Sequence, residues 1–188
     1  MHPSATDGFK RMLSDGMGHL PIPSEVRVLD VGGADVNGTV HGWVRRILRP
    51  SVCTFDVLDI ADGPGVTMIG DASSAEFWSG LAESGSRYDL VISTETLEHV
   101  EGWRQIVDGA SEVLRSGGWF AGTCASLGRR PHGARGEHWP PEGEHYGNVQ
   151  PDGLIAVLLG AFSGDVVIEY SRRPGFPTTN DLYWRAER

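Results

Sequence analysis

Residues 26–40 have the sequence VRVLDVGGADVNGTV. A largely apolar, partly alternating run meets an acid at Asp30, and after Val31 the pattern gives way to two glycines. Alternation with a period of two is typical of a strand, and glycines let the backbone approach a ligand with no side chain between them. The stretch therefore predicts a strand, a candidate binding turn and the beginning of a helix. Glycines also form tight turns that bind nothing, so this turn alone does not establish a site.

Similar apolar runs, bounded by Gly, Pro, Asp or Ser, recur along the chain and alternate with segments of helical periodicity. The predicted strands are residues 26–31, 53–58, 66–69, 88–93, 119–124, 165–173 and 181–188. The predicted helices are residues 40–48, 74–82, 103–114 and 153–162. Strands that alternate with helices form βαβ units, which close right-handed onto a mostly parallel sheet. We therefore predict a doubly wound, Rossmann-like α/β fold with helices on both faces of the sheet.

The length of 188 residues suits one domain with a sizeable core and is short for two. We expect a single domain over residues 1–188. Residues 1–23 predict a lead-in helix that ends at the prolines of LPIPS, because proline interrupts a helix. Residues 125–151 are crowded with Gly, Pro and His, and a loop of this length inside a compact domain is usually functional or disordered. We interpret this segment as a candidate substrate lid.

The composition excludes several classes of protein. The net charge of -9 and the pI near 5.2 provide no basic footprint for a nucleic-acid backbone. No apolar run approaches the ~20 residues that a membrane helix needs, and the first residues lack the apolar core of a secretory signal. We expect no nucleic-acid or membrane partner and a cytoplasmic location. Cys53 and Cys124 lie in apolar contexts, which predicts buried thiols rather than a disulfide or a zinc site.

Acidic side chains lie near the ends of three successive predicted strands: Asp30 is within the first, Asp59 is at the end of the second and Asp71 is just past the third. In an open parallel sheet, ligands bind beyond the carboxyl ends of the strands where the strand order reverses. A carboxylate such as Asp59 commonly holds the two neighbouring hydroxyls of a ribose. Asp59 and Asp71 are also common as helix-cap or turn residues, so the three acids together carry more weight than any one of them.

Five segments together resemble class I S-adenosylmethionine-dependent methyltransferases. VLDVGG, TFDVLDI and GDAS are similar to the first three motifs of that family, YDLVISTETLEHV to the fourth, and VLRSGGWFAGT to its helix, glycine turn and fifth strand. LEHV followed by VLRSGG is the most specific of these signals. The resemblance covers residues 26–118, with a looser continuation to the end. It implies a seven-stranded sheet whose last strand, residues 181–188, is antiparallel.

The resemblance also implies roles for individual residues. Asp30, Gly32 and Gly33 would support the methionine part of S-adenosyl-L-methionine. Asp59 would bind the ribose hydroxyls, and Ile60 would lie against the adenine. The remaining cofactor residues would hold the adenine amino group or line the sulfonium end, and they are Asp71, Ala72, Ser93, Thr94 and Glu95. One departure is Ala34, which stands where the family usually has the middle glycine of Gly-x-Gly-x-Gly.

Two other functions stay open from the sequence. A nicotinamide-dependent oxidoreductase would need G-x-G-x-x-G, so that the pyrophosphate lies on a helix N-terminus. Here the third glycine is missing, and Asp35 would face the phosphates. A positively charged sulfonium suits an acidic turn better. The second alternative is a non-catalytic module that binds S-adenosylmethionine or a nucleotide without turnover.

The expected acceptor is a small molecule with a hydroxyl, a sugar first, because no additional domain is available to hold a macromolecule. A hydroxyl often needs a base, and histidine suits that task near neutral pH. The candidate acceptor-side residues are His145, His138 and His99, of which His99 equally fits a packing role. No metal is predicted, because the His and Glu spacings match no recognised ligand pattern. Arg129 and Arg130 are expected to be solvated.

Overall fold

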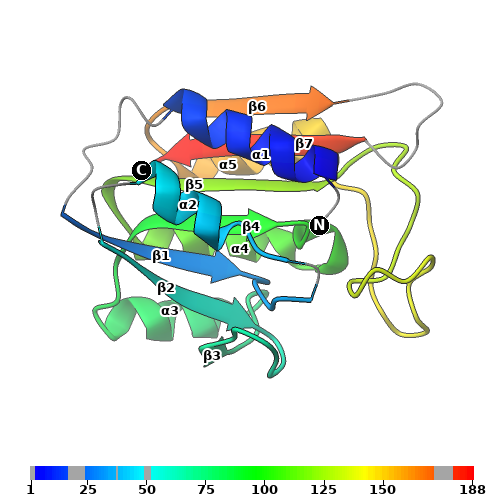
Figure 1. The fold of residues 1–188 in the computed structure, drawn as a ribbon, viewed down its shortest axis with the longest axis horizontal. Helices are drawn as coiled ribbons and strands as arrows, with labels where there is room; N and C mark the ends of the chain where they lie inside the picture. Colours follow the sequence, from blue (N-terminus) through cyan, green and yellow to red (C-terminus); the bar gives the residue numbers. More distant parts are fainter. Residues whose placement is uncertain (1–2, 17–23, 37, 49–51, 172–179) are drawn as a thin grey trace.

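The computed structural model describes residues 3–16, 24–36, 38–48, 52–171 and 180–188. A seven-stranded sheet in the order β3-β2-β1-β4-β5-β7-β6 forms its centre. The strands are β1 (Glu25–Val31), β2 (Val52–Asp59), β3 (Met68–Ile69), β4 (Tyr88–Thr94), β5 (Leu114–Ala125), β6 (Val166–Ser171) and β7 (Asp181–Glu187). Strands β1 to β5 pair in parallel, and β7 runs antiparallel to both of its neighbours. The predicted fold class is confirmed (Figure 1).

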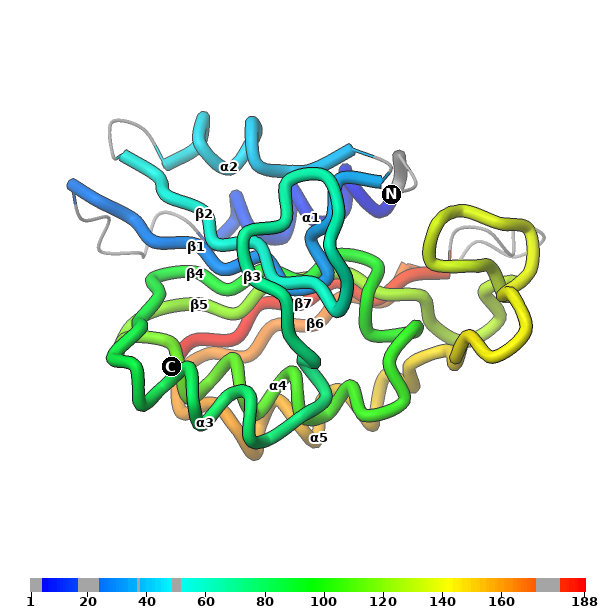
Figure 2. Tube along the Cα trace, turned by 90° about the horizontal axis from the view of Figure 1, so that it is seen from below, coloured from blue at the N-terminus to red at the C-terminus, as the bar shows by residue number. Residues whose placement is uncertain are grey.

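Helices cover both faces of the sheet, as Figure 2 shows most directly. Helices α1 (Pro3–Gly16) and α2 (His41–Ile47) lie on one face. Helices α3 (Ala75–Glu83), α4 (Trp103–Val113) and α5 (Pro151–Ala161) lie on the other, and a short 3-10 helix, η2 (Leu97–His99), follows β4. No helix in the described part of the chain is long and apolar enough to cross a membrane.

Two apolar clusters hold the three layers together. Phe9 of α1 and Val44 of α2 are buried in the cluster on one face. Trp78 and Trp184 are fully buried in the cluster on the other face. Large aromatic side chains contribute most to such burial. Trp103, at the beginning of α4, packs in the same cluster and is 8% exposed.

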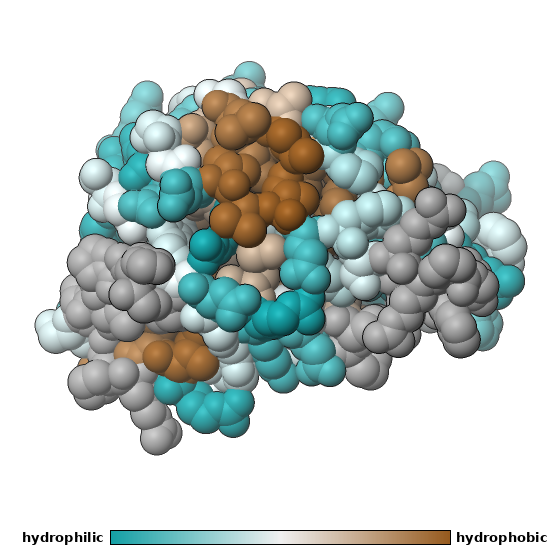
Figure 3. All heavy atoms as spheres, turned by 90° about the horizontal axis from the view of Figure 1, so that it is seen from above, coloured by the Kyte–Doolittle hydropathy of each residue, from teal (hydrophilic) through white to brown (hydrophobic). Residues whose placement is uncertain are grey.

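Helix α5 is apolar on two sides. Leu154 and Leu158 are fully buried, whereas Ile155 and Leu159 are 37% and 63% exposed. Figure 3 shows hydrophobic side chains gathered on the face of the molecule that is seen from above. An amphipathic surface helix normally has a polar outer side, so α5 differs from that pattern.

The largest differences between the predicted and the observed boundaries are at β3 and β5. Strand β3 contains two residues rather than the four of 66–69. Strand β5 begins at Leu114, five residues before the predicted 119, and Gly117 with φ 77° accommodates the accompanying register shift against β4. The lead-in helix is α1, and the predicted proline turn at residues 20–23 lies outside the described residues, as do residues 172–173 of a predicted strand. Cys124 is buried and Cys53 is partly buried, and both are free.

The strand order reverses between β1 and β4, since β1 pairs with β2 on one side and with β4 on the other. The carboxyl ends of these three parallel strands lie together at one edge, on the side where the yellow-green loop extends in Figure 1. Such a reversal is where ligands bind in open α/β sheets. The fold thus brings the glycine turn, the ends of β2 and β4, and the long loop into one region.

Candidate active site

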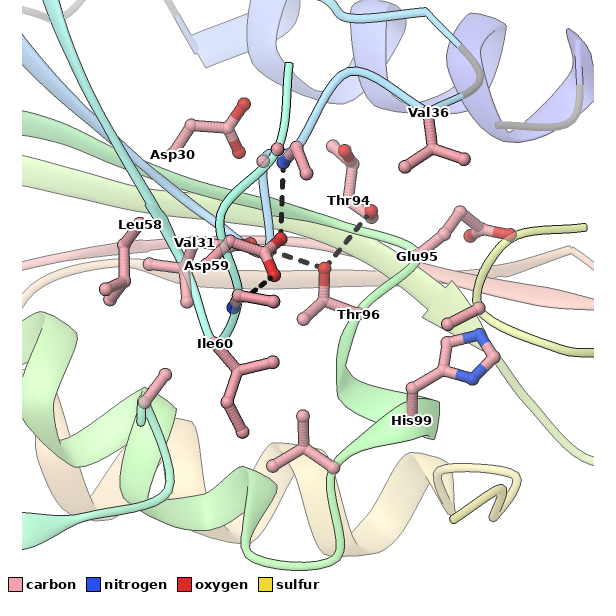
Figure 4. Close-up of a pocket in the computed structure, with 18 of the residues that line it drawn as sticks. Asp30, Val31, Val36, Leu58, Asp59, Ile60, Thr94, Glu95, Thr96 and His99 are labelled. Carbon is pink, nitrogen blue, oxygen red and sulfur yellow. Dashed lines mark hydrogen bonds between the residues drawn. The ribbon is translucent and has the colours of Figure 1, made fainter. Parts of the chain in front are cut away.

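A cavity of about 880 Å³ opens at the carboxyl ends of β1, β2 and β4. It is lined by residues 30–36, 38–39, 58–64, 70–73, 94–96 and 99–101, together with Ala134, Arg135 and Glu144 of the long loop. Ligand pockets usually have volumes of roughly 300–1,000 Å³. In Figure 4, Asp59 and Ile60 lie on one side of this cavity, and Glu95 and His99 lie on the other, nearer the long loop. The cavity therefore has two ends with different chemistry.

The turn after β1 leaves no room for side chains. Gly32 has φ 71°, a left-handed conformation that favours glycine, and a Cβ there would lie 2.3 Å from Oγ1 of Thr96. A Cβ on Gly33 would lie 2.5 Å from the carboxyl carbon of Asp30. Both backbone N–H groups donate to the carbonyl oxygen of Leu58, over 2.8 and 3.3 Å. Both glycines are therefore required for this turn.

Asp30 lies beneath the turn and is 3% exposed. Its Oδ2 is 2.6 Å from Nε2 of His41, at the beginning of α2. Burial raises the pKa of the Asp30 carboxyl, and the hydrogen bond to His41 opposes that shift. Asp30 lines the cavity and at the same time joins β1 to α2.

Asp59 ends β2 and presents its carboxylate to the cavity (Figure 4). Oδ2 accepts from the N–H of Ala34 over 3.3 Å, and Oδ1 accepts from the N–H of Ala61 over 3.4 Å. These bonds are long, and a carboxylate offers about four acceptor sites. Asp59 therefore retains capacity for further donors. Beside it, Ile60 is 72% exposed and offers an apolar surface at the rim of the cavity.

Asp71 caps the loop after β3. Its Oδ1 accepts from the N–H of Ser73 over 2.8 Å and from the Ser73 hydroxyl over 2.7 Å. The carbonyl of Ala72 accepts from the indole N–H of buried Trp78 over 2.9 Å, which anchors this loop to the core. Asp71 therefore stabilises the turn and also lines the cavity, so both roles that the sequence left open apply to it.

Of the predicted residues at the end of β4, Thr94 and Glu95 line the cavity and Ser93 does not. Ser93 is fully buried within the sheet. Glu95 has φ 55°, uncommon for a residue other than glycine. Its Oε1 accepts from the Thr123 hydroxyl over 3.2 Å, and its Oε2 lies 3.4 Å from the Arg129 guanidinium. Burial raises the pKa of the Glu95 carboxyl, and the charge of Arg129 opposes the shift.

Acidic groups dominate the wall of the cavity. The carboxyl groups that line it belong to Asp30, Asp35, Asp59, Asp62, Asp71, Glu95, Glu101 and Glu144. Among the described residues of the wall, Arg135 is the single arginine or lysine. The pyrophosphate of a dinucleotide would face carboxylates here, whereas a cation would be attracted. The cavity therefore favours a positively charged ligand.

His99 lies at the end of the cavity nearer the loop. Its ring contacts those of His132 and Tyr146 edge-on, with centroids 5.2 and 5.4 Å apart. Its Nδ1 lies 3.5 Å from Oε1 of Glu144. Burial lowers the pKa of His99 to about 4, and the neighbouring His132 and His145 add to the shift. The imidazole is therefore neutral at physiological pH.

The acid before His99 was not among the predicted site residues. Glu98 is fully buried, and its Oε1 accepts from the N–H of Ala125 over 3.0 Å. Burial, together with the nearby charge of Glu95, raises the pKa of the Glu98 carboxyl well above its usual value. The only indication of Glu98 in the sequence is its position in the LEHV motif, directly before His99, which lines the cavity. Thr96, which contacts the glycine turn, was also missed.

The long loop brings neither of its two predicted site residues to the cavity. His138 and His145 are exposed and do not line it. The expectation that Arg129 is solvated is wrong, since its side chain is 7% exposed and pairs with Asp181 of β7 and with Glu95. Arg130 is exposed, as expected. The charge of Arg129 is buried because two carboxylates from distant segments surround it, which spacing along the chain does not reveal.

Comparison with known proteins finds methyltransferases both among family models and among solved structures. A family model described as a methyltransferase domain matches residues 4–159. The chain is similar to the CurJ carbon methyltransferase, with TM-score 0.63 and 16% identity over 96% of this chain and 53% of that one. It thus spans about half the length of that protein. None of the curated proteins matches the chain in sequence.

Two further solved structures are similar. The N-terminal domain of EvdMO1, solved in the presence of SAH and D-fucose, has TM-score 0.65 and 14% identity over 99% of this chain and 83% of that one. The N-methyltransferase NodS from Bradyrhizobium japonicum, in complex with S-adenosyl-L-homocysteine (SAH), has TM-score 0.58 and 15% identity over 100% of this chain and 88% of that one. At these identities the similarity establishes a shared fold.

Proposed function

This chain belongs to the methyltransferase-domain family, and on that premise we propose that its cavity binds S-adenosyl-L-methionine for methyl transfer to a hydroxyl of a small molecule. The observation that carries the proposal is the acid-lined cavity at the reversal of strand order. A sulfonium is a cation, so the charge of this wall favours it. The same wall disfavours the phosphates of a nicotinamide dinucleotide, which was the leading alternative.

The ribose and adenine would bind at the end of β2. The Asp59 carboxylate faces the cavity and has acceptor capacity left for two neighbouring hydroxyls. The exposed side chain of Ile60 supplies an apolar surface for a flat ring. Asp71 and Ala72, across the cavity wall, would receive the adenine amino group. This assignment agrees with the roles that the sequence resemblance implies.

The methionine part would lie over the glycine turn. The backbone of Gly32 and Gly33 is open to the cavity because neither residue has a Cβ, and Asp30 supports the turn from below. Thr94 and Glu95 would line the sulfonium end. When bound, S-adenosylmethionine supplies a methyl carbon for an in-line displacement, and the protein mainly contributes proximity and alignment.

The acceptor would bind between Glu95, His99 and Glu144, where the long loop completes the wall. These polar side chains suit a molecule with hydroxyl groups, and the EvdMO1 domain was solved with a sugar, D-fucose, present. We include His99 on the acceptor side because it lines the cavity. His138 and His145 are left out of the proposed site because both are exposed and neither lines it.

Calorimetric titration with S-adenosylmethionine, SAH and NAD tests the cofactor. We expect the first two to bind and NAD not to bind. An acceptor screen with a labelled methyl donor then tests the hydroxyl assignment, with sugars as the first compounds. Binding of NAD alone would overturn the proposal, and cofactor binding without turnover on any acceptor would favour the non-catalytic module.

A pair of histidine variants tests the acceptor side. His99→Asn should leave the Kd for SAH unchanged and lower kcat by roughly 10- to 100-fold, because a displacement of ~1 Å at the reacting centre can cost about 10² in rate. His145→Asn should retain full activity. Equal losses of kcat in the two variants would contradict this division of the loop histidines.

A further inference from the structure

A buried acid and two histidines gather behind the acceptor end of the cavity. Glu98 and His99 come from η2, and His132 comes from the long loop. One donor atom from each of the three side chains lies within 4.8 Å of the other two. Glu98 is fully buried, and the two imidazoles are partly buried. The cluster is thus formed by two segments that lie far apart in the sequence.

The hydrogen bonding of this cluster is incomplete. Oε2 of Glu98 and Nδ1 of His99 are buried and have no hydrogen-bond partner among the described residues. Oε1 of Glu144 lies 3.5 Å from the His99 nitrogen, which is longer than a good hydrogen bond. Leaving a buried polar atom unsatisfied costs roughly 1–3 kcal/mol. A ligand that contacts both atoms would remove this cost.

We propose that Glu98, His99 and His132 bind a divalent transition-metal cation. Two imidazoles and one carboxylate are a donor set for Zn²⁺, Mn²⁺ or Fe²⁺, whereas Mg²⁺ and Ca²⁺ prefer oxygen ligands throughout. Three protein ligands also leave at least one coordination position open. The donor set therefore assigns the class of the cation and predicts that a further ligand can reach it.

Only a small movement is needed to bring the donors to coordination distance. Metal bonds of about 2.0–2.2 Å place the donors of a tetrahedral site roughly 3.5 Å apart, compared with at most 4.8 Å in the structure. His132 lies on the long loop, so its side chain can approach without disturbing the sheet. Oε1 of Glu144 lies 3.5 Å from the same Nδ1 of His99, so this carboxylate adjoins the proposed site.

The protonation of the cluster is compatible with a cation. Burial lowers the pKa of both His99 and His132, so their nitrogen lone pairs are available at neutral pH. Burial raises the pKa of the Glu98 carboxyl, and a bound cation would favour its ionised form. Arg129 is the nearby positive charge, and it is neutralised by its ion pairs with Asp181 and Glu95.

The open coordination position would face the acceptor end, because His99 and Glu144 line the cavity. An oxygen of the acceptor could occupy it, and a metal lowers the pKa of a hydroxyl that it binds. This role for the cation rests on the proposed function, whereas the cation site itself does not. The sequence predicted no metal because these residues have no recognised spacing, and the fold brings them together across the loop.

The test is calorimetric titration of the chelator-treated full chain with ZnCl₂, MnCl₂ and MgCl₂, with the metal content after dialysis measured by mass spectrometry. We expect one equivalent of zinc or manganese and weaker binding of magnesium. Glu98→Gln and His132→Asn should each weaken binding by roughly tenfold or more, since even residues that only support a metal ligand contribute 10- to 100-fold. His138→Asn, an exposed histidine of the same loop, is the matched control.

Circular dichroism and SAH titration establish that each variant is folded, and His132→Asn keeps the test valid if Glu98→Gln does not fold. Absence of metal binding by the wild-type chain would overturn the proposal, and so would equal losses in His138→Asn and the two cluster variants. All metal titrations are made without methyl donor. Metal binding without SAH binding would therefore defeat the proposed function alone, and SAH binding without metal binding would defeat the cation site alone.

Discussion

Gly32 and Gly33 are adjacent, yet different physical constraints fix them. Gly32 needs a positive φ of 71° and has Thr96 against it. Gly33 has no unusual φ, but a Cβ there would lie 2.5 Å from the Asp30 carboxyl carbon, too close for any side chain. The first constraint belongs to the backbone, and the second belongs to packing. Substitutions at the two positions therefore act through different neighbours.

Gly33→Ala isolates the packing constraint. The new Cβ would lie 2.5 Å from the carboxyl carbon of Asp30, so the Asp30–His41 pair must move. We expect the affinity for SAH to fall by about tenfold or more, and we expect a loss of stability of roughly 1–3 kcal/mol, typical of overpacking. Calorimetry and urea denaturation measure the two effects.

Gly42→Ala is the control for this substitution. Gly42 is exposed in the first turn of α2 and has no heavy atom within 4 Å of the position of a Cβ. Alanine stabilises a helix relative to glycine by up to about 1 kcal/mol, so SAH affinity should be unchanged and stability slightly higher. If Gly33→Ala behaved like Gly42→Ala, the tight contact at Asp30 would not matter for binding.

Asp59 is the residue that we expect to bind the ribose. Asp59→Ala should weaken S-adenosylmethionine binding by roughly 1.5–3 kcal/mol, the usual contribution of a hydrogen bond to a charged group. Asp59→Asn should weaken it less, because the amide oxygen can still accept from the N–H of Ala34 and one ribose hydroxyl. Glu112→Gln, an exposed carboxylate on α4, controls for the change in net charge. Unchanged affinity in Asp59→Ala would remove this residue from the ribose site.

The sequence correctly placed at the cavity those residues that lie at the ends of strands. Asp59 ends β2, Ile60 follows it, and Asp71 comes two residues after β3, so the order of the chain places them at the cavity. Ser93 was expected to line the cavity and is buried instead, since its side chain packs within the sheet. Glu98 was missed because its importance depends on burial, a tertiary property that local patterns do not contain.

At the scale of elements, the long loop is fastened at both ends. Ser126 forms a bridge with Val149, and its hydroxyl donates to the Val149 carbonyl over 2.8 Å. Asn148 donates to the carbonyl of Arg129 over 3.0 Å. The sequence predicted a loop here from Gly, Pro and His, but pairing between residues more than twenty positions apart is not visible in such a composition. The loop is therefore better anchored than its composition suggests.

Arg129 joins this loop to β7 and to the end of β4. Arg129→Met would remove the guanidinium charge that pairs with the buried carboxylates of Asp181 and Glu95. We expect a loss of roughly 3–5 kcal/mol in the free energy of unfolding, as is typical when one partner of a buried pair is removed. Urea denaturation followed by circular dichroism measures this loss.

Two further variants serve as comparisons for Arg129→Met. Arg129→Lys keeps the charge but not the planar fork that reaches two carboxylates, so its loss should be intermediate. Arg130→Met changes the exposed neighbour and should alter stability by less than about 0.5 kcal/mol. A stability of Arg129→Met within that same small range would mean that the buried ion pairs contribute little to the fold.

At the scale of the whole molecule, topology concentrates the acidic charge. Asp30, Asp59 and Glu95 belong to or directly follow β1, β2 and β4, and the parallel arrangement brings all three to one edge of the sheet. Alternating strand and helix patterns were sufficient to predict this arrangement. The antiparallel last strand was implied by the family resemblance, because nothing in the alternation distinguishes its direction. Beyond the strand ends, the cavity wall is formed by loops, whose positions the sequence pattern does not predict.

This concentration of charge leads to a prediction about salt. S-adenosylmethionine carries one more positive charge than SAH, at the sulfonium, and is otherwise nearly identical, so the difference between their affinities isolates the charge of the wall. Raising NaCl from ~0.1 M to ~1 M shortens the Debye length from about 10 Å to about 3 Å. Exposed wall carboxylates such as Asp35, Asp62 and Glu101 are then screened from the sulfonium. The ratio of Kd for S-adenosylmethionine to Kd for SAH should therefore rise by about threefold or more. Parallel calorimetric titrations at the two salt concentrations measure it, and an unchanged ratio would show that the acidic wall does not act on the sulfonium.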